Sequence, residues 1–295
     1  MINFFKYNSS GNDFIIIDNR DKIFSINSHY IKKLCDRNFG IGADGLILLE
    51  KSSEANYFMN YFNSDGFISS FCGNGNLCCA HFACHVGLLN KKKKDIEGTF
   101  STREGVFNFR FNDDKVLISM PDIIDYNISK TQTSKDIVID TGSPHYVIFK
   151  DSIDNLDITK EAHLIRNSKL YLEEGINVNF ADSQILRKHS AFELKNKSTI
   201  NVRTYERGVE SETLSCGTGV VAAAISEVIY YILYLDSVKL PHKFSRSTKV
   251  NTLGGVLDVQ FHCSYQKKNS VFTFNFSSIF LSNKVHMVFQ GQLPF

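Results

Sequence analysis

The chain carries one arrangement of short motifs twice, and this repeat constrains its fold more than any other feature. A cysteine precedes a Gly-x-Gly turn at Cys72 and again at Cys216, and an apolar run of helical length follows each turn. Two landmarks precede each cysteine in the same order, namely 11–14 and 40–44 in the first half and 142–145 and 175–179 in the second. Corresponding residues lie 131 to 144 positions apart. This order and spacing predict two similar halves, each built as one repeated unit.

Short β-branched or aromatic runs predict strands, and the two apolar runs predict buried helices. The first-half strands are predicted at Phe14–Asp18, Gly45–Glu50, Tyr57–Asn63 and within Thr99–Met120, with helices from a Ser28 cap to about Arg37 and over Asn74–Leu88. The second-half strands are predicted at Ile137–Asp140, Tyr146–Phe149, Asn177–Phe180, Thr199–Tyr205, Val256–Phe261, Val271–Phe276 and His286–Phe289, with helices from a Thr159 cap to about Asn167 and from Thr218 to about Leu235. The boundary between the halves is predicted in a polar stretch between strands, Tyr126–Lys135.

Size and charge favour a globular protein of two domains that does not bind nucleic acid. The 295 residues suit two domains of ordinary size, and an apolar content of 43% is enough to build their cores. The net charge of +2 gives no basic stripe, so we expect no nucleic-acid partner. The one dense basic segment, Lys91–Lys94, is predicted to be a solvated loop.

The cysteine content argues against a disulfide framework or a zinc site. The chain has seven cysteines, an odd number, and they form no repeated C-x-x-C pair. Cys78, Cys79 and Cys84 lie inside the first apolar run, where packing is their expected role. A reducing cytoplasm fits this usage best, and no metal is expected.

No segment predicts export or membrane insertion. The start of the chain, Met1–Phe14, mixes polar residues into any apolar stretch, so we expect no signal peptide. The longest apolar run, Val220–Leu235, is expected to be too short to span a bilayer and contains Glu227. We interpret it as a buried core helix of a cytoplasmic protein.

Both motifs place a thiol where a helix begins, and this position favours reactivity. The first N–H groups of a helix lack internal partners, and the helix dipole adds partial positive charge there. Such an end binds a carboxylate and lowers the pKa of a nearby cysteine. Cys72 and Cys216 are therefore candidate bases next to a carboxylate-binding turn, although each alone is also typical of a small buried residue before a helix.

Two thiols facing one carbon centre from opposite sides would invert it. A thiolate removes the proton from one face and a thiol delivers a proton to the other. Pyridoxal phosphate, the usual electron sink for such a carbanion, needs a lysine Schiff base, and no lysine stands in a recognisable motif for one. The cofactor-free route holds the developing charge with N–H donors from helix ends. We therefore expect no cofactor.

Polar residues at the repeated landmarks complete the candidate site. His145 and Glu206 are candidates to orient or deprotonate the thiols, although a strand-end histidine and a surface ion pair are the alternatives. Arg207 can bind a carboxylate with two N–H groups. The amides that could bind ammonium and carboxylate groups are those of Asn12, Asn63, Asn177 and Asn179.

These residues resemble the diaminopimelate epimerase family over nearly the whole chain. The first-half motifs that carry the resemblance are Gly11-Asn12-Asp13-Phe14, Gly40-Ile41-Gly42-Ala43-Asp44-Gly45, Tyr61-Phe62-Asn63-Ser64-Asp65-Gly66 and Cys72-Gly73-Asn74-Gly75. The second-half motifs are Gly142-Ser143-Pro144-His145, Gly175-Ile176-Asn177-Val178-Asn179-Phe180, Tyr205-Glu206-Arg207-Gly208 and Ser215-Cys216-Gly217-Thr218-Gly219. Several motifs in family order make the resemblance specific.

The resemblance implies an α/β (α+β) fold of two pseudo-symmetric domains, each a curved, mainly antiparallel sheet wrapped around a central helix, with the active site in the cleft. The domains would be 1–128, with a last strand returning at about 284–295, and 129–283. It also implies a cofactor-independent enzyme, often a homodimer, that interconverts LL- and meso-2,6-diaminopimelate for lysine and peptidoglycan synthesis.

By motif, the resemblance assigns roles to individual residues. Cys72 and Cys216 would be the acid/base pair, supported by His145 and Glu206. The side chains that would contact substrate are Asn12, Asn63, Ser143, Asn177, Glu206 and Arg207. The backbone that would hold the reacting carboxylate is at Gly73, Asn74, Gly217 and Thr218. The chain departs from the family pattern at Ser143, where asparagine is usual, and at Leu77, where arginine is usual.

Two other functions share part of this pattern. A proline or hydroxyproline racemase also pairs two cysteines but usually shows Cys-Gly-His-Gly, whereas this chain has Cys72-Gly73-Asn74-Gly75. A non-enzymatic protein that binds metal or senses redox state through its cysteines is the alternative of another class. In it, Cys72 and Cys216 would bind metal or form a disulfide.

Overall fold

The computed structural model describes residues 1–69, 71–89, 96–129, 135–188, 197–235 and 240–294. The predicted loop Lys91–Lys94 lies outside these residues. The chain divides into two compact units, which we name the N-terminal unit (Met1–Ser119 with Ser282–Phe295) and the C-terminal unit (Met120–Leu281).

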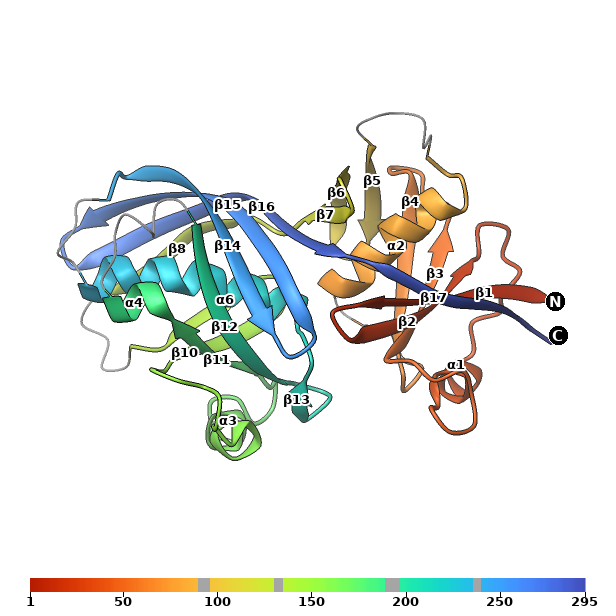
Figure 1. Ribbon diagram of the computed structural model, residues 1–295, viewed down its shortest axis with the longest axis horizontal. Coiled ribbons are helices and arrows are strands. Elements are labelled where there is room, and N and C mark those ends of the chain that lie inside the picture. Colours follow the sequence, from red (N-terminus) through yellow and green to blue (C-terminus); the bar gives the residue numbers. More distant parts are fainter. Residues whose placement is uncertain (70, 90–95, 130–134, 189–196, 236–239, 295) are drawn as a thin grey trace. The chain divides into compact units, whose positions relative to one another are not determined.

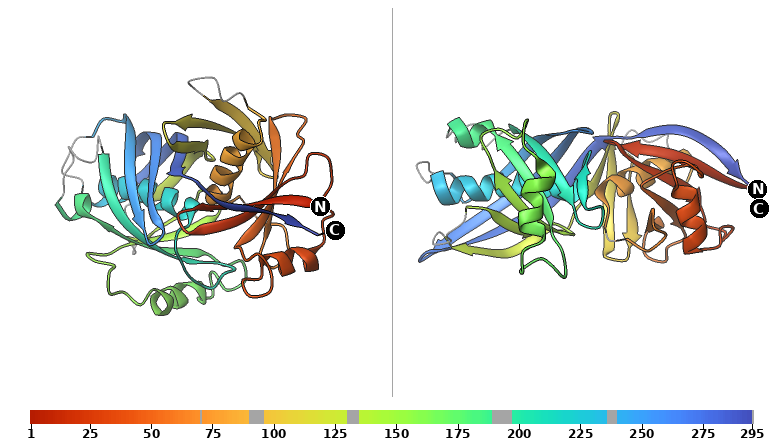
Figure 2. Two further views of the ribbon diagram at one scale, coloured as in Figure 1. Left: turned by 45° about the vertical axis from the view of Figure 1, so that its right-hand side comes forward. Right: turned by 90° about the horizontal axis from the view of Figure 1, so that it is seen from below.

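The N-terminal unit contains a sheet around one long helix. Its elements are β1 (Ile2–Ser9), β2 (Asn12–Asp18), α1 (Ser28–Cys35), β3 (Gly45–Glu50), β4 (Tyr57–Asn63), α2 (Gly73–His85), β5 (Glu97–Thr102), β6 (Gly105–Asn112), β7 (Lys115–Ser119) and β17 (His286–Leu293). The last strand returns to pair with the first, Ile2 opposite Leu293, so the two ends of the chain lie side by side (Figure 1, Figure 2).

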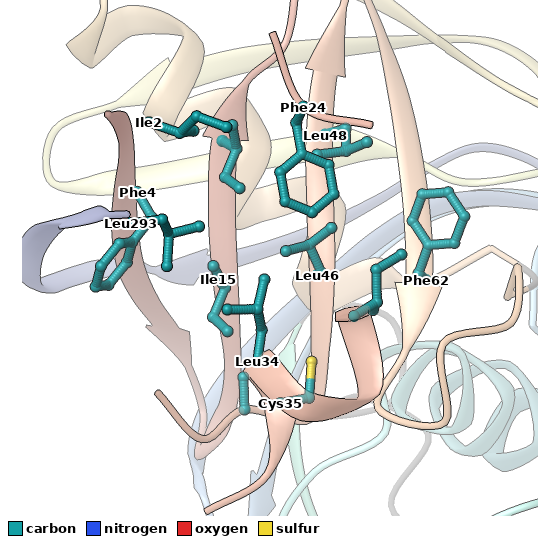
Figure 3. Packing of buried hydrophobic residues seen from close by; sticks show 13 residues of the cluster. Ile2, Phe4, Ile15, Phe24, Leu34, Cys35, Leu46, Leu48, Phe62 and Leu293 are labelled. Atoms are coloured by element: carbon teal, nitrogen blue, oxygen red, sulfur yellow. The ribbon is translucent and has the colours of Figure 1, made fainter. Parts of the chain in front are cut away.

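Helices cover both faces of the first strands of this sheet, which explains their unbroken apolar sequences. Figure 3 shows Ile15 and Leu46 on one face, packed with Leu34 of α1. Ile47 faces the other way, and its side chain comes close to Gly75 of α2. Helix α2 contacts β1, β2, β3, β4 and β7, so the sheet wraps around it. The first turn of α2, which begins after Cys72, is thereby held in the core.

The C-terminal unit repeats this plan with longer strands. Its elements are β8 (Ile123–Ser129), β9 (Ile137–Asp140), β10 (Pro144–Phe149), α3 (Ile158–Arg166), β11 (Asn177–Ser183), α4 (Gln184–Lys188), β12 (Lys197–Glu206), β13 (Ser211–Thr213), α6 (Gly217–Tyr230), the π-helical turn η1 (Tyr231–Leu235), β14 (Lys243–Thr252), β15 (Gly255–Lys268) and most of β16 (Val271–Lys284). Helix α3 packs on one face of β11 through Ile158 and Ala162, and α6 contacts the sheet through strands β9 to β12, β14 and β15 (Figure 1).

The two units pair their strands in the same order, which confirms the predicted pseudo-symmetry. In the first unit β1–β2 is antiparallel, β2–β3 parallel across α1, β3–β4 antiparallel, β4–β5 parallel across α2 and β5–β6 antiparallel. In the second unit β9–β10, β10–β11, β11–β12, β12–β14 and β14–β15 follow the same sequence of directions, with α3 and α6 in the two crossovers. The predicted fold class, a mainly antiparallel α+β sheet around a central helix in each half, is confirmed.

Several local predictions were wrong. The N-caps are Asn27 and Asp157, whose side chains accept from the N–H groups of Tyr30 and Lys160, rather than Ser28 and Thr159. The segment expected to be a polar stretch between strands begins inside β8, because Ile123–Ser129 pairs with β16. Strands β1 and β14 were not predicted.

The second core helix agrees with its predicted range to within one residue at its start, but it is longer than the apolar run Val220–Leu235. With η1 it runs over 19 residues, Gly217–Leu235, which is long and apolar enough to cross a membrane by length and composition alone. The expectation that it is too short was therefore wrong. However, 83% of its most apolar window is buried within the protein, and Glu227 is buried with it. These contacts are those of a core helix.

Candidate active site

Cys72 occupies the N-cap of α2. Its backbone is extended (φ −119°, ψ 107°), and its Sγ accepts the N–H of Gly75 at 3.4 Å. Gly73 and Asn74 form the first turn of the helix and are buried, whereas Cys72 is half-buried. The positive end of the helix dipole therefore acts on a sulfur that retains some access to solvent.

Asn12 is the second polar group at Cys72. The Cys72 Sγ lies 3.8 Å from the Asn12 Oδ1, within reach for S–H donation. The Nδ2 of Asn12 donates to the Asp44 carboxylate at 2.6 Å. Because a carboxylate accepts and does not donate, this bond fixes which end of the amide faces the sulfur. Asn12 thus presents an acceptor to Cys72.

A cluster of charges holds Asp44 in place. Arg37 donates to Asp44 and to both carboxylate oxygens of Asp13, at 2.8 to 3.1 Å. Lys6, almost fully buried, forms an ion pair with Asp13 at 2.6 Å and donates to the Gly42 carbonyl. Burial alone would raise the pKa of Asp13, but hydrogen bonds from Arg37 and Lys6 lower it to about 2. The Asp13 carboxylate next to Asn12 therefore stays ionised.

Cys72 also lines a small cleft within the N-terminal unit. The other residues that line it are Met59, Tyr61, Ser69, Phe71, Asn76, Thr102, Arg103 and Glu104.

Cys216 occupies the matching N-cap in the C-terminal unit. Its backbone is extended in the same way (φ −113°, ψ 112°) before α6. Its Sγ lies 3.5 Å from the Oγ1 of Thr218, and Cys216 is 8% exposed. The carbonyl of Thr218 accepts the hydroxyl of Thr141 at 2.9 Å, which holds this first turn against the strand before β10.

His145 lies directly behind this turn. Its Nε2 is 2.9 Å from Thr218 Oγ1, and its Nδ1 is 3.0 Å from Asn179 Nδ2. The ring is completely buried, and this burial, together with the charge of Arg207, lowers the pKa of His145 to about 3. His145 is therefore a neutral imidazole that reaches Cys216 through the Thr218 hydroxyl.

A second group of candidates in the C-terminal unit consists of Ser143, Asn177 and Arg207, whose contacts connect them. Asn177 donates to Ser143 Oγ at 2.9 Å and to the Pro144 carbonyl at 3.0 Å, and it accepts the backbone N–H of Arg207 at 3.0 Å. The guanidinium of Arg207 donates to the Glu174 carbonyl at 2.9 Å and approaches Ser143 Oγ at 3.5 Å. Ser143, which replaces the usual asparagine, thus lies between an amide and a guanidinium.

Glu206 and Asn63 have local partners. Glu206 is half-buried and accepts the hydroxyl of Thr213 across the β12–β13 pair. Asn63 closes β4, where its backbone N–H donates to Phe67 and its carbonyl accepts from Gly66. The roles that the resemblance implies for these two residues stay predictions.

Sequence reasoning grouped Cys216 with His145 but missed the groups that connect each thiol to its surroundings. Asp44 was seen only as a landmark, and Asn179 was expected to contact substrate, whereas its amide faces His145. Thr218 was expected to act through its backbone, yet its side chain contacts the sulfur. The only available signal was that Asp44 and Asn179 end the repeated landmarks of the two halves.

The other cysteines are packing residues. Cys35, Cys78, Cys79, Cys84 and Cys263 are buried, and burial raises the pKa of Cys35 and of Cys263 to about 12. Within the described ranges no group of three or more His, Cys, Asp or Glu side chains could hold a metal ion. Cys72 and Cys216 differ from the others because each stands at the first turn of a buried helix.

Comparison with known proteins gives one consistent result. A family model described as diaminopimelate epimerase matches residues 4–120 and 137–273, that is, both halves of the chain. A diaminopimelate epimerase of Flavobacterium psychrophilum is 38% identical over 97% of this chain and 98% of its own length. The corresponding enzyme of Aquifex aeolicus is 32% identical over 98% and 97%.

Solved structures share the fold at much lower identity. A phenazine biosynthesis protein of the PhzF family from Bacillus anthracis is 14% identical with a TM-score of 0.66, covering 100% of this chain and 99% of its own. A probable proline racemase from Agrobacterium radiobacter is 13% identical with a TM-score of 0.60, covering 100% and 93%. These two likenesses concern the fold alone.

Proposed function

Because this chain belongs to the diaminopimelate epimerase family, we propose that its two N-cap cysteines carry out the reaction for which its relatives are named. The enzyme is an amino-acid epimerase that converts LL- to meso-2,6-diaminopimelate, a step of lysine biosynthesis. The observation that carries the mechanism is that each unit presents one cysteine at the N-cap of its buried central helix. We propose that the two units are the two epimerase halves and act on one substrate carbon from opposite faces.

The chemistry is two-base proton transfer without a cofactor. The thiolate of one cysteine removes the α-proton, and the thiol of the other protonates the opposite face. The α-carboxylate carries the developing charge and is held by the N–H groups of Gly73, Asn74, Gly217 and Thr218 at the two helix starts. Each such donor contributes about 3 kcal/mol to transition-state stabilisation.

The remaining candidates hold the rest of the substrate. Arg207 and Asn177 have the donors that a carboxylate needs, and Glu206 has the acceptors that an ammonium needs. Asn12 and Asn63 would supply amide groups from the N-terminal half, and Ser143 a hydroxyl from the other. His145 supports Cys216 through the hydroxyl of Thr218. We further propose that the enzyme works in the cytoplasm as a homodimer.

The experiment that tests this function is proton exchange at the α-carbon. The purified protein incubated with LL-diaminopimelate in D₂O should produce the meso isomer with one deuterium at the inverted carbon. Proline is the control substrate, because a proline racemase would exchange its α-proton instead. Absence of exchange with diaminopimelate, or exchange with proline alone, would contradict the proposal.

Cofactor independence has its own test. Hydroxylamine, which traps carbonyl cofactors, should leave epimerisation unchanged, because no Schiff base forms in a two-thiol mechanism. Inhibition together with release of a bound chromophore would show that a carbonyl cofactor takes part.

A further inference from the structure

We propose that Asn179 is a positioning residue for Cys216: it fixes the direction of a buried hydrogen-bond relay, so that the Thr218 hydroxyl donates to the Cys216 sulfur and favours its thiolate. The relay runs from Thr204 through Asn179, His145 and Thr218 to Cys216. The inference deepens the proposed function, since it concerns the protonation state of one of the two proposed bases.

The direction of the relay begins at the Asn179 amide. Its Oδ1 accepts the hydroxyl of Thr204 at 2.9 Å, and its Nδ2 lies 3.4 Å from the carbonyl of Tyr146. A carbonyl accepts and does not donate, so this pair of contacts identifies the nitrogen end of the amide. The same nitrogen lies 3.0 Å from His145 Nδ1. Asn179 therefore donates to that ring nitrogen.

The donation decides the tautomer of His145. A neutral imidazole has one N–H, and a ring nitrogen that accepts a hydrogen bond leaves the proton on the other nitrogen. The ring is fully buried, and the nearby charge of Arg207 also disfavours a second proton. His145 therefore carries its proton on Nε2 and donates it to Thr218 Oγ1 at 2.9 Å.

The last contact follows from the one before it. Since Thr218 Oγ1 accepts from His145, its own hydroxyl proton is available for the Cys216 sulfur at 3.5 Å. A donor directed at sulfur stabilises the thiolate more than the thiol, as does the start of α6. The setting of the other thiol is mixed: the Cys72 sulfur accepts the N–H of Gly75, but Asn12 turns an oxygen toward it and Asp44 holds that oxygen there.

Gly219 shows that the relay is built into the packing of the helix. A Cβ at this position would lie 2.4 Å from Asn179 Oδ1 and 3.2 Å from His145 Cε1. The second glycine of the Cys-Gly-Thr-Gly motif therefore gives these two side chains the space they occupy behind Cys216.

The test compares Thr218→Val with Thr218→Ser. Valine keeps the shape of threonine and removes the hydroxyl, whereas serine keeps the hydroxyl. The rate of Cys216 alkylation by iodoacetamide at pH 7 is read by mass spectrometry, with Cys72 of the same molecule as internal reference. We expect Thr218→Val to slow the alkylation of Cys216 about tenfold relative to that of Cys72. This is the effect of raising the pKa of the Cys216 thiol by roughly one unit. Serine should restore the rate to within about twofold.

The histidine provides a second, spectroscopic readout. The ¹⁵N spectrum of the imidazoles should show His145 as the Nε2–H tautomer, identified by the signals absent from a His145→Gln variant. Asn179→Ala should abolish the preference for this tautomer and, like Thr218→Val, should slow the alkylation of Cys216. An Nδ1–H tautomer in the wild type, or equal slowing by valine and serine, would overturn the proposal.

These readouts do not depend on turnover. If the alkylation and ¹⁵N results are as expected but diaminopimelate is not epimerised, the relay stands and the proposed function fails. If the enzyme is active but the alkylation rate of Cys216 relative to Cys72 is the same in Thr218→Val as in the wild type, the function stands and the relay is wrong.

Discussion

Asn12 donates to Asp44 Oδ2 at 2.6 Å, and this one bond decides that the oxygen of the amide, rather than its nitrogen, faces Cys72. An amide that could rotate would offer the sulfur either a donor or an acceptor. The ionised cluster of Lys6, Asp13 and Arg37 holds Asp44 and thus the amide in one orientation. A charge cluster that lies three contacts from the sulfur, through Asp44 and Asn12, therefore controls the polarity of the surroundings of Cys72.

Replacing Asp44, which anchors the Asn12 amide, should show that the orientation of this amide matters for activity. In Asp44→Asn the side chain can donate as well as accept, so the Asn12 amide is no longer fixed. We expect kcat/KM to fall by about tenfold, or about 1.4 kcal/mol, with the fold intact. The matched control is Asp18→Asn, which breaks the partly exposed pair of Asp18 with Arg20 and should leave kcat/KM unchanged. A wild-type kcat/KM for Asp44→Asn would refute the role of the anchor.

Both thiols should be required for inversion. Cys72→Ala and Cys216→Ala should each abolish formation of meso-diaminopimelate, measured by chiral chromatography. The free energy of unfolding of each variant should lie within about 2 kcal/mol of the wild-type value, because the side chain lost is small and stands at a helix start. Cys35→Ala, at a buried core cysteine that ends α1, should lower the stability but retain inversion. Normal epimerisation by either N-cap variant would contradict the two-base mechanism.

The two motif glycines should differ in their tolerance of a methyl group. Gly219→Ala places a Cβ 2.4 Å from Asn179 Oδ1, an atom held by a buried hydrogen bond from Thr204. Gly75→Ala, at the matching position of α2, meets the flexible end of Met59 at 3.0 Å, and the Cys72 sulfur and the end of Ile47 at an ordinary contact distance of 3.4 Å. We expect Gly219→Ala to lose much more activity and to unfold at a lower temperature. Equal effects on Tm and on kcat would show that the packing behind Cys216 is not special.

A buried ion pair supports the central helix of the C-terminal unit. Glu227 of α6 pairs with Arg246 of β14, and both side chains are completely buried. Arg246→Leu removes the cation and leaves the carboxylate uncompensated, so we expect the free energy of unfolding to fall by about 3–5 kcal/mol in urea titrations. Lys51→Met breaks the exposed pair with Asp21 and should cost less than about 1 kcal/mol. A similar cost for both variants would rule out this account of the pair.

The buried neutral histidine should make the protein sensitive to acid. The pKa of His145 is about 3 in the folded state, against 6.5 for an ordinary histidine. Between these two pH values the unfolded chain binds a proton that the folded protein does not bind, so stability falls as the pH is lowered from 6.5. The slope from this one group is at most about 1.4 kcal/mol per pH unit. His145→Gln should have a shallower slope in unfolding experiments between pH 6.5 and 4, and an unchanged slope would contradict a neutral buried ring.

Much of the fold follows from local sequence patterns. The apolar runs after Cys72 and Cys216 form the two central helices, because a helix that is apolar on all sides must be buried. The strands at Gly45–Glu50 and Tyr57–Asn63 agree with their predicted ranges, because short apolar or aromatic runs bounded by turn-forming residues are typical of strands. Strand β14 was not predicted because its sequence mixes lysine, serine and threonine, and only its pairing with β12 and β15 makes it a strand.

By itself, the sequence determined that the chain consists of two similar halves and that each half presents one cysteine before a buried helix. Periodicity, glycine turns and spacing are local properties, so they can be recognised without coordinates. Only the tertiary structure decided what faces each sulfur. The parallel register that sets His145 opposite Asn177 brings Asn179 within reach of the imidazole, and a shift by one residue would turn that amide to the other face of the sheet. The orientation of an amide depends on its neighbours in space, and these come from strands that lie far apart in the sequence.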